Sequence, residues 1–266
     1  MKYKRSFFNI LAVLISLFLI LGSCGAPSQQ SEKDAPDTSE YTGELLFEGR
    51  RYTYKGEPSD ILAKKDCLTV TKGGVYLISG KLTDGRIAVR CDEEVTFVFG
   101  GFEGSSSIGA LIAREDGGSL RLSALPNTVN ILRSEHGSKD GKIDALPTGA
   151  ISVTGRLVLC GEGKITVSAP EGNGLVCSDL YMRGGGITIG CGEYGIWARN
   201  SVLVNGGKLT VTSSRIGIFA NRSDYCEGKI ELSGDCRVSL VFREAATKTD
   251  GTLTVNTPYF SSSKGS

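Results

Sequence analysis

This chain contains almost no histidine, and neither positive nor negative charge is in clear excess. The 266 residues include one histidine, and 30 Lys and Arg balance 29 Asp and Glu to a formal net charge of +1. A near-neutral protein lacks the positive field that attracts phosphate backbones, which excludes nucleic acid as a partner. With one histidine and no two cysteines in CxxC spacing, a zinc site of the common kinds is excluded as well.

Helical periodicity and proline are also scarce. Few windows place apolar residues at the i, i+3, i+4 spacing of an amphipathic helix, and 7 prolines stand against 36 glycines. Short β-branched runs separated by Gly, Asn and Asp are typical of strands and turns. The sequence therefore predicts an all-β protein, and the roughly 220 residues that follow residue 43 suffice for a single domain.

The cysteines do not form an even set. Seven of the eight lie beyond Cys24, and seven thiols cannot all pair in an exported protein. We therefore expect most of them to be buried as small hydrophobic side chains. Cys67 and Cys91 lie about one repeat apart, so a disulfide between them stays open.

The one long apolar run lies at the N-terminus. The basic "MKYKR" precedes the uncharged "SFFNILAVLISLFLILGS", which ends at Cys24. This pattern predicts a secretory signal peptide over residues 1–23. A transmembrane anchor is the alternative, but no basic stop-transfer cluster follows. "LGSC" resembles the lipobox of bacterial lipoproteins, which implies lipidation of Cys24 and anchoring to the outer face of the cell membrane. Residues 24–43, rich in Pro, Ser, Gln and acids, are expected to form a flexible tether.

A repeat with a period near 22 residues occupies most of the remaining chain. Its best column reads "GKITV", "GGITI", "GKLTV" and "GKIEL", and a second column reads "GLVCSD", "GIWARN" and "GIFANR". Self-similarity at a fixed period indicates a solenoid, in which stacked units share one core. With no Leu/Asn ladder and two or three strand-like runs per unit, the pattern predicts a parallel β-helix over residues 44–266. The columns begin at Gly163, Gly185, Gly207, Gly228, and at Gly174, Gly195, Gly217.

Alternation within each repeat predicts which side chains face the core. In "GKITV", Ile165 and Val167 face inward, whereas Lys164 and Thr166 face outward. Two segments depart from the repeat. Residues 133–148 are polar, contain the single histidine His136, and predict an inserted loop. Residues 243–266 are expected to cap the open end of the solenoid.

The stretch "LTVTKGGVYLISGKLTDGRIAV", followed by "NTVNIL", an inserted loop and coils of the form G-I-x-A, resembles a known group. This group is the bacterial carbohydrate-binding domain-containing β-helix lipoproteins, related in fold to pectate lyases, and the resemblance covers about residues 66–235. It implies a right-handed parallel β-helix at the cell surface that binds acidic plant-type polysaccharide such as polygalacturonate. It also implies calcium in some members.

The coils depart from that family where calcium would bind. Family coils commonly carry an acidic pair before the Gly-Ile, whereas here only Glu171 and Glu193 remain near the corner, with Asp179 as a further oxygen donor in the following turn. Ca²⁺ takes six to eight oxygen ligands, so carbonyls and water would have to complete such a site. Calcium bound by Glu171, Asp179 and Glu193 is a hypothesis, and no cofactor is otherwise required.

The second column of the repeat predicts an outward row of side chains. If Leu175, Ile196 and Ile218 face inward, the residues that follow them face outward. Rings on such a row suit the flat apolar faces of sugars, and a polar rim suits their hydroxyls. A register slip of one residue would turn the row into core, and a loop or a partner subunit covering it is a further alternative. The candidate carbohydrate-binding residues are Ile151, Val176, Tyr194, Trp197, Arg199, Asn200, Phe219, Asn221 and Arg222.

The outward lysines form a second candidate face, and the acids are the candidate catalytic residues. A column of Lys164, Lys208 and Lys229 interleaved with threonines would suit carboxylates, although a solvated outer face is the simpler interpretation. The acids are scattered, and "REDGG" at residues 114–118 is interpreted as a solvated turn. No catalytic constellation emerges.

The sequence therefore predicts a monomeric lipoprotein that binds polysaccharide without catalysis. The alternatives are a structural or adhesive β-helix that binds a protein partner, and a degenerate polysaccharide lyase.

Overall fold

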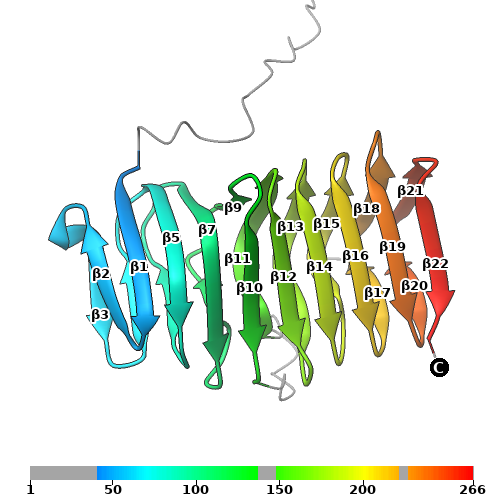
Figure 1. Ribbon diagram of the computed structural model, residues 1–266. Helices are drawn as coiled ribbons and strands as arrows, with labels where there is room; N and C mark the ends of the chain where they lie inside the picture. The colour runs from blue at the N-terminus through cyan, green and yellow to red at the C-terminus, as the bar shows by residue number, and fades with distance from the viewer. Residues whose placement is uncertain (1–40, 137–147, 222–226, 266) are drawn as a thin grey trace, which may run out of the picture. The chain divides into compact units, whose positions relative to one another are not determined.

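The computed structural model describes residues 41–136, 148–221 and 227–265, and strands dominate these ranges (Figure 1). The helical element among them is one 3₁₀ turn, η2 (Pro58–Asp60). No helix in the described ranges is long and apolar enough to cross a bilayer. The predicted all-β class is confirmed. The signal peptide, Cys24 and most of the tether lie outside the described residues.

The strands follow one another along the chain with short connections. They are β1 (Gly43–Gly49), β2 (Arg51–Lys55), β3 (Ile61–Lys64), β4 (Cys67–Val70), β5 (Gly74–Leu82), β6 (Arg86–Val89), β7 (Val95–Ser106), β8 (Ile112–Arg114), β9 (Leu120–Ala124), β10 (Val129–Ser134), β11 (Gly149–Gly161), β12 (Lys164–Ala169), β13 (Asn173–Met182), β14 (Gly186–Cys191), β15 (Ile196–Val204), β16 (Lys208–Ser213), β17 (Ile216–Ala220), β18 (Lys229–Ser233), β19 (Arg237–Phe242), β20 (Ala245–Thr249), β21 (Thr252–Asn256) and β22 (Phe260–Lys264).

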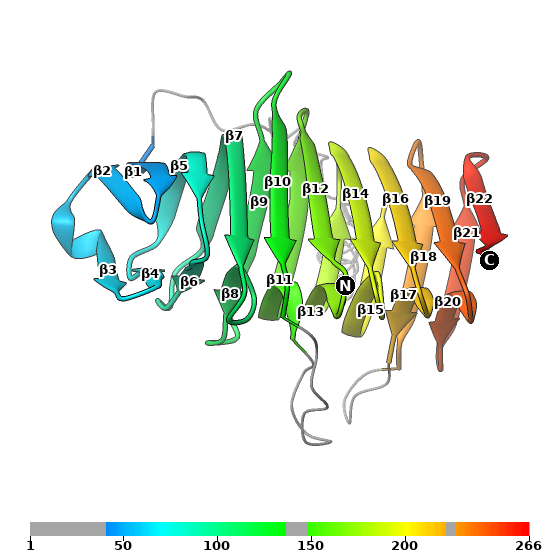
Figure 2. The ribbon, with the colours of Figure 1, turned by 60° about the horizontal axis from the view of Figure 1, so that its bottom comes forward.

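Parallel pairing arranges the strands in three sheets around one core (Figures 1 and 2). The first sheet runs β1–β5–β7–β10–β12–β14–β16–β19–β22. The second runs β4–β6–β8–β11–β13–β15–β17–β20. The third runs β7–β9–β11–β13–β15–β18–β21. This mostly parallel solenoid is consistent with a β-helix. That the β-helix is right-handed stays a prediction.

The length of a coil varies along the solenoid. The coil from β12 to β14 and the coil from β14 to β16 are equally long, because the pairing advances by the same number of positions in each. Leu209 then pairs with Val238, which makes the following coil longer. On the second sheet Ile112 pairs with Ile151, and the coil between them includes the segment expected to be an inserted loop. The added residues fall between strands, so apolar side chains still meet apolar side chains across the coils.

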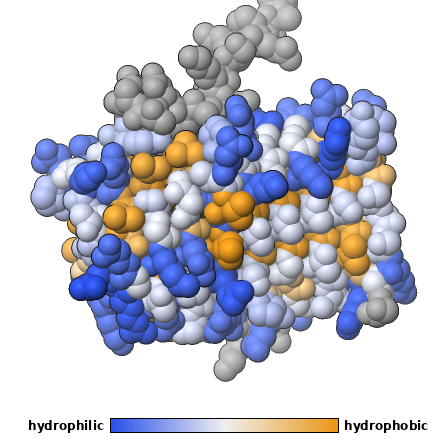
Figure 3. Space-filling view, in the orientation of Figure 1, coloured by the Kyte–Doolittle hydropathy of each residue, from blue (hydrophilic) through white to orange (hydrophobic). Residues whose placement is uncertain are grey.

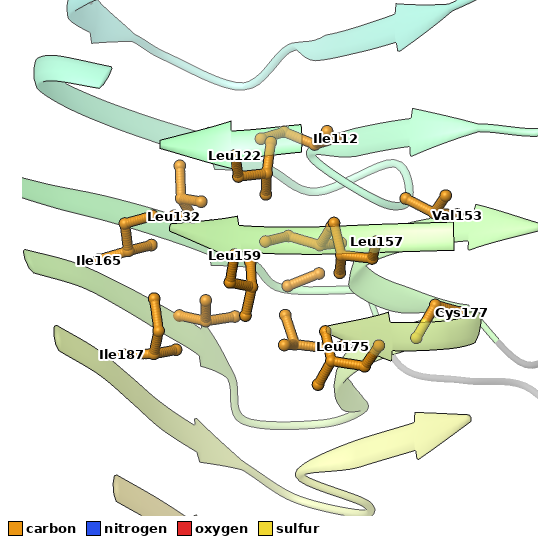
Figure 4. Packing of buried hydrophobic residues seen from close by; sticks show 14 of the residues in the cluster. Ile112, Leu122, Leu132, Val153, Leu157, Leu159, Ile165, Leu175, Cys177 and Ile187 are labelled. Carbon is orange, nitrogen blue, oxygen red and sulfur yellow. The ribbon is translucent and has the colours of Figure 1, made fainter. Parts of the chain in front are cut away.

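The core consists of stacked aliphatic columns. Ile165 and Val167 are 2% and 1% exposed, which confirms the predicted inward positions in β12. Figure 4 shows side chains from the three sheets meeting in the interior, among them Leu132, Leu159 and Leu175. Burying one such side chain contributes about 1.5–3 kcal/mol, so stacking supplies the stability that a single coil lacks.

The two ends of the solenoid differ from each other and from the expectation. The first coils carry antiparallel hairpins, β1–β2 and β3–β4. The expected cap over residues 243–266 is wrong, because β20, β21 and β22 pair in parallel with β17, β18 and β19 and add another coil. Leu253 and Val255 pair with Ile230 and Leu232 of the core columns but are 48% and 43% exposed, so this coil extends the columns and does not cover them.

The thiols behave mainly as small core side chains. Cys160, Cys177 and Cys236 are at most 1% exposed, and burial raises the pKa of Cys177 and Cys236. Cys67 and Cys91 are partly exposed free thiols. Cys67 lies opposite Arg86 at the start of the β4–β6 pair, whereas Cys91 follows the end of that pair. The two therefore lie too far apart for the disulfide that the sequence left open.

Candidate functional site

Three aromatic side chains gather on the outer side of the second sheet. Trp197 of β15 lies directly opposite Phe219 of β17, because Ile196 and Ile218 before them occupy the core column. Tyr194 precedes β15 and lies against both rings. The ring centroids are 4.9 Å apart for Tyr194 and Trp197, and 5.4 Å apart for each of the other two pairs. All three residues are half-buried. We call Tyr194, Trp197 and Phe219 the aromatic platform.

Arg215 fixes one side of the platform. Its guanidinium carbon lies 4.9 Å from the centre of the Tyr194 ring. Nη1 bonds Glu193 at 3.1 Å, and Nε bonds Glu244 at 3.0 Å. Hydrogen bonds from Glu244 and Glu193 raise the pKa of Arg215. The guanidinium thus holds the tyrosine ring by a cation–π contact and offsets two carboxylates beside it.

A further cation lies at the other side of the platform. Lys248 of β20 pairs with Phe219, and its ammonium lies 6.0 Å from the centre of the phenylalanine ring. Lys248 is exposed, so its charge is available to a ligand on the rings. Sequence analysis missed Arg215, Glu244 and Lys248. The sequence did carry a signal for Arg215, because it follows Glu193 by the length of one coil and two such residues lie on adjacent coils.

Two predicted members of the row are not on the surface. Ile151 is 1% exposed, because it pairs with Ile112 and Leu175 in the core column. The expectation that it faces outward is wrong by one residue, since Ser152 is the residue that pairs with Val176. Val176 does share the outward row with Trp197, but it is 0% exposed. The backbone at Gly149 lies over its side chain, since a Cβ there would come 2.9 Å from Val176 Cγ2.

The polar rim is only partly as predicted. Arg199 and Asn221 are exposed, whereas Asn200 is half-buried. Asn200 Nδ2 donates to Asp179 Oδ2 at 3.2 Å, so the amide makes a hydrogen bond to the neighbouring coil. Arg222 lies outside the described residues.

The candidate calcium ligands are dispersed. Glu193 pairs with Arg215, and Asp179 accepts bonds from Asn200 and from Ser201 Oγ, the latter at 2.6 Å. Glu171 is exposed. In the part of the chain that the structure describes, no group of three or more His, Cys, Asp or Glu residues is placed to hold a metal ion.

A polar hollow of about 360 Å³ lies at a corner of the second sheet, in the coils that precede the platform. Its wall includes Arg156, whose guanidinium lies 4.9 Å from the Tyr181 ring centre, and Asp179. It is lined by Gly117, Ser119, Thr154, Gly155, Arg156, Ser178 and Asp179.

The basic column divides between two faces. Lys164 and Lys208 lie in one outward column of the first sheet, joined by Gly186. Lys229 pairs with Ser201 in the third sheet and does not belong to that column. Figure 3 shows the first sheet's outer face, where hydrophobic residues gather near the middle. Val129 on this face is 58% exposed.

The "REDGG" turn is solvated as expected at residues 115–117, but its first residue is not. Arg114 is 0% exposed, because its side chain occupies the core column between Val89 and Val153. Its nitrogens bond Asp116, at 2.7 Å, and the carbonyls of Cys91, Glu93 and Ser119. The side chain of Glu115 is 73% exposed and that of Asp116 is 23% exposed.

Comparison with known proteins places the chain among relatives. A family model described as "Carbohydrate-binding domain-containing protein" matches residues 64–261. A protein of that description from Acetivibrio thermocellus is 24% identical over 184 residues, and the match covers 68% of this chain and 64% of that protein. The structure of a polysaccharide lyase-like protein from C. thermocellum, a gadolinium derivative, covers 84% of this chain and 97% of its own at 19% identity, with a TM-score of 0.64. The structural likeness supports the fold. Because the family model spans most of the sequence, the chain belongs to the family of carbohydrate-binding domain-containing proteins.

Proposed function

We propose that the protein binds polysaccharide on the aromatic platform. The observation that carries this proposal is the contact among Tyr194, Trp197 and Phe219 on the outer side of a sheet, with each ring partly open to solvent. Sugar rings stack on aromatic faces, and a preformed cluster binds them without ordering its side chains first. Membership of a carbohydrate-binding domain family supports this assignment.

The charges beside the platform favour an acidic, plant-type glycan. Lys248 and Arg199 are exposed cations, and Arg215 offsets the two carboxylates that would otherwise repel a polyanion. A polyuronate such as polygalacturonate is therefore the ligand we infer. Calcium held by Glu171, Asp179 or Glu193 together with the glycan is a further part of the proposal.

We infer binding without turnover. A lyase needs a base free to take the proton beside the uronate carboxyl. The carboxylates nearest the platform, Glu193 and Glu244, both pair with Arg215. Incubation with polygalacturonate should therefore release no unsaturated sugars that absorb in the ultraviolet, and their release would favour the degenerate lyase instead.

The location of the protein is proposed from its sequence. The signal over residues 1–23 and Cys24 favour a lipoprotein on the outer face of the bacterial cell membrane, and we propose that it is a monomer there. Metabolic labelling with a fatty-acid analogue should label the wild type and not Cys24→Ala, which gel fluorescence of the immunoprecipitated protein would measure. Equal labelling of the variant would contradict lipidation at Cys24.

The deciding experiment measures binding of the purified protein to polygalacturonate and to a neutral glucan, with calcium and with chelator. Trp197→Ala should weaken binding about tenfold or more, since the loss of a stacked ring and its aromatic pairs amounts to about 1.4 kcal/mol or more. The control is Tyr259→Ala, an aromatic side chain that is 51% exposed outside the platform. Loss on chelation would support a calcium site. No binding to either glycan would contradict the carbohydrate proposal and favour a structural or adhesive role.

A further inference from the structure

A second hollow lies toward the opposite end of the solenoid from the aromatic platform. It is bounded by the antiparallel hairpins of the first coils and by the turn between β5 and β6. The hollow measures about 50 Å³, room for the polar edge of one sugar residue and too little for a chain to pass through. It shares no residue with the platform.

One wall of the hollow is a fixed hydrogen-bonding surface. Arg50 Nη2 lies 2.7 Å from Asp84 Oδ2, and Arg50 Nη1 lies 3.5 Å from Asp66 Oδ1. Asp84 Oδ1 also accepts bonds from Ser107 N at 3.0 Å and Ser107 Oγ at 2.5 Å. These contacts hold two carboxylates and a guanidinium in one arrangement, and each carboxylate keeps acceptor capacity for a ligand hydroxyl.

The floor beside this wall is apolar. Phe47, Leu68 and Leu82 line the hollow and are 3%, 4% and 6% exposed. Tyr52 stands at the rim, 38% exposed, with its ring centroid 6.3 Å from that of Phe47. An apolar floor with a few fixed polar groups at its edge is the usual composition of a small-molecule site. A sugar matches it, since its C–H face packs on apolar surface while its hydroxyls exchange hydrogen bonds with acids and guanidinium.

The backbone of the hollow is unusual. Lys65 and Asp84, which both line it, have φ values of 48° and 51°. Among the described residues, the one other non-glycine residue with positive φ is Asn127. Residues held in the left-handed region cluster at sites where the geometry of side chains matters. Here the two residues lie in turns that bound the same hollow, with the Asp84 carboxylate beside Arg50 and the Lys65 side chain 91% exposed.

We propose that this hollow is a second carbohydrate site, which takes the hydroxyl edge of a single pyranose. This inference rests on the proposed function, because it assumes that the protein meets glycans. Arg50, Lys65 and Arg86 are balanced by Asp66, Asp84 and the Glu115 carboxylate 3.9 Å from Arg86, so the site takes a neutral or a uronic sugar through its hydroxyls. The chain then contacts glycan at two places, by stacking on the platform and by edge-on binding at the first coils.

Cys67 reports directly on the hollow. Cys67 is one of the residues that line the cavity and is partly exposed, whereas the partly exposed Cys91 lies beyond the other end of the same strand pair. The experiment alkylates the full-length protein with iodoacetamide, with and without galacturonic acid or cellobiose, and follows each cysteine by peptide mass spectrometry. At a sugar concentration of ten times Kd, alkylation of Cys67 should slow about tenfold, because only the empty fraction reacts. Alkylation of Cys91 should not change.

Variants separate the hollow from the platform. Arg50→Met and Asp84→Asn should each remove the protection of Cys67. Lys55→Met, which breaks an exposed ion pair with Glu44 on the same hairpin, is the matched control and should keep it. Trp197→Ala should keep it as well, while it weakens binding to the polymer.

Each outcome decides between the two sites. Any of three results would overturn the second site, even if the polymer still binds through Trp197. Neither sugar protects Cys67, or protection survives both Arg50→Met and Asp84→Asn, or Cys91 is protected equally. Protection of Cys67 with no effect of Trp197→Ala on polymer binding would overturn the platform and leave the hollow. If Cys67 is not alkylated in the free protein, equilibrium dialysis replaces the alkylation experiment. The Arg50→Met variant should then bind one sugar fewer per chain than the wild type.

Discussion

Arg215 determines how firmly the aromatic platform is held. The Arg215→Met variant keeps most of the side-chain volume but loses the cation–π contact and both ion pairs. We expect polygalacturonate affinity to fall about two- to fivefold, since an exposed cation–π contact contributes about 0.5–1 kcal/mol. The melting temperature should change little, because exposed ion pairs are worth about 0–1 kcal/mol. Arg237→Met is the control, since Arg237 stacks on Tyr259 at 5.0 Å away from the platform. Equal losses of affinity in the two variants would contradict the role of Arg215.

Asp116 makes folding stability depend on acid pH. Burial alone would raise the pKa of its carboxyl, but hydrogen bonds from Arg114 and from the backbone of Gly118 and Cys91 outweigh burial and lower it. A folded pKa below the unfolded one means that the ionised form stabilises the native state. This contribution is complete above the unfolded pKa of about 3.9 and is lost as the pH falls through the folded pKa.

The Asp116→Asn variant should therefore lose less stability than the wild type as the pH is lowered from about 5 to about 2. Urea denaturation at a series of pH values measures this difference. Glu115→Gln, next to it and largely exposed, serves as the control and should keep the wild-type dependence. An unchanged slope in Asp116→Asn would show that the carboxylate is not coupled to folding.

At the scale of the strands, the turn before β16 depends on its glycine. Gly207 has φ of 77°, and a Cβ there would lie 2.5 Å from the carbonyl oxygen of Gly185 in the previous coil. Gly207→Ala should destabilise the protein by more than about 1 kcal/mol. Gly190→Ala should change the free energy of unfolding by less than about 0.5 kcal/mol, because nothing lies within 4 Å of the added methyl group. Denaturant midpoints compare the two, and similar losses would refute the steric argument.

The same strands show how far sequence reasoning reaches. Alternation in "GKITV" was enough to predict the inward positions of Ile165 and Val167, and the column of Ile165 continues through the next two coils because coils of constant length keep the same phase. It was wrong for Ile151, because Ile151 pairs with Leu175 24 positions later, whereas Leu175 pairs with Ile196 after 21, so a constant period does not carry the phase back to Ile151.

Contacts between distant residues were beyond prediction for a different reason. Arg114 stands in a stretch with the composition of a turn, and its burial follows from carbonyls of Cys91 and Glu93 that only the folded coil brings close. The bond from Arg215 to Glu244 likewise joins residues with no local pattern in common. Propensity and alternation describe neighbours along the chain, whereas the candidate sites depend on neighbours across coils.

For the molecule as a whole, stability is the sum of contacts between adjacent coils. A strand such as β14 pairs on both sides, with β12 and β16, whereas β22 pairs with β19 and with no other described strand. Hydrogen exchange should therefore proceed first in β20–β22 and last in the middle coils. Mass spectrometry of deuterated peptides measures the order. Protection of β22 equal to that of β14 would mean that something covers the last described coil.

The buried guanidinium of Arg114 has a mechanical consequence. Backbone hydrogen bonds between coils run across the strands, along the direction in which the coils stack, so tension along that direction loads one coil interface after another. β8 offers three paired residues to each neighbour in the second sheet, as many as β15 and β17 share. Arg114 stands in β8 and bonds to carbonyls of the preceding coil. It therefore adds side-chain hydrogen bonds to the backbone pairing of this interface, and a protein stretched between its first coils and Trp197 would carry part of the force through this side chain.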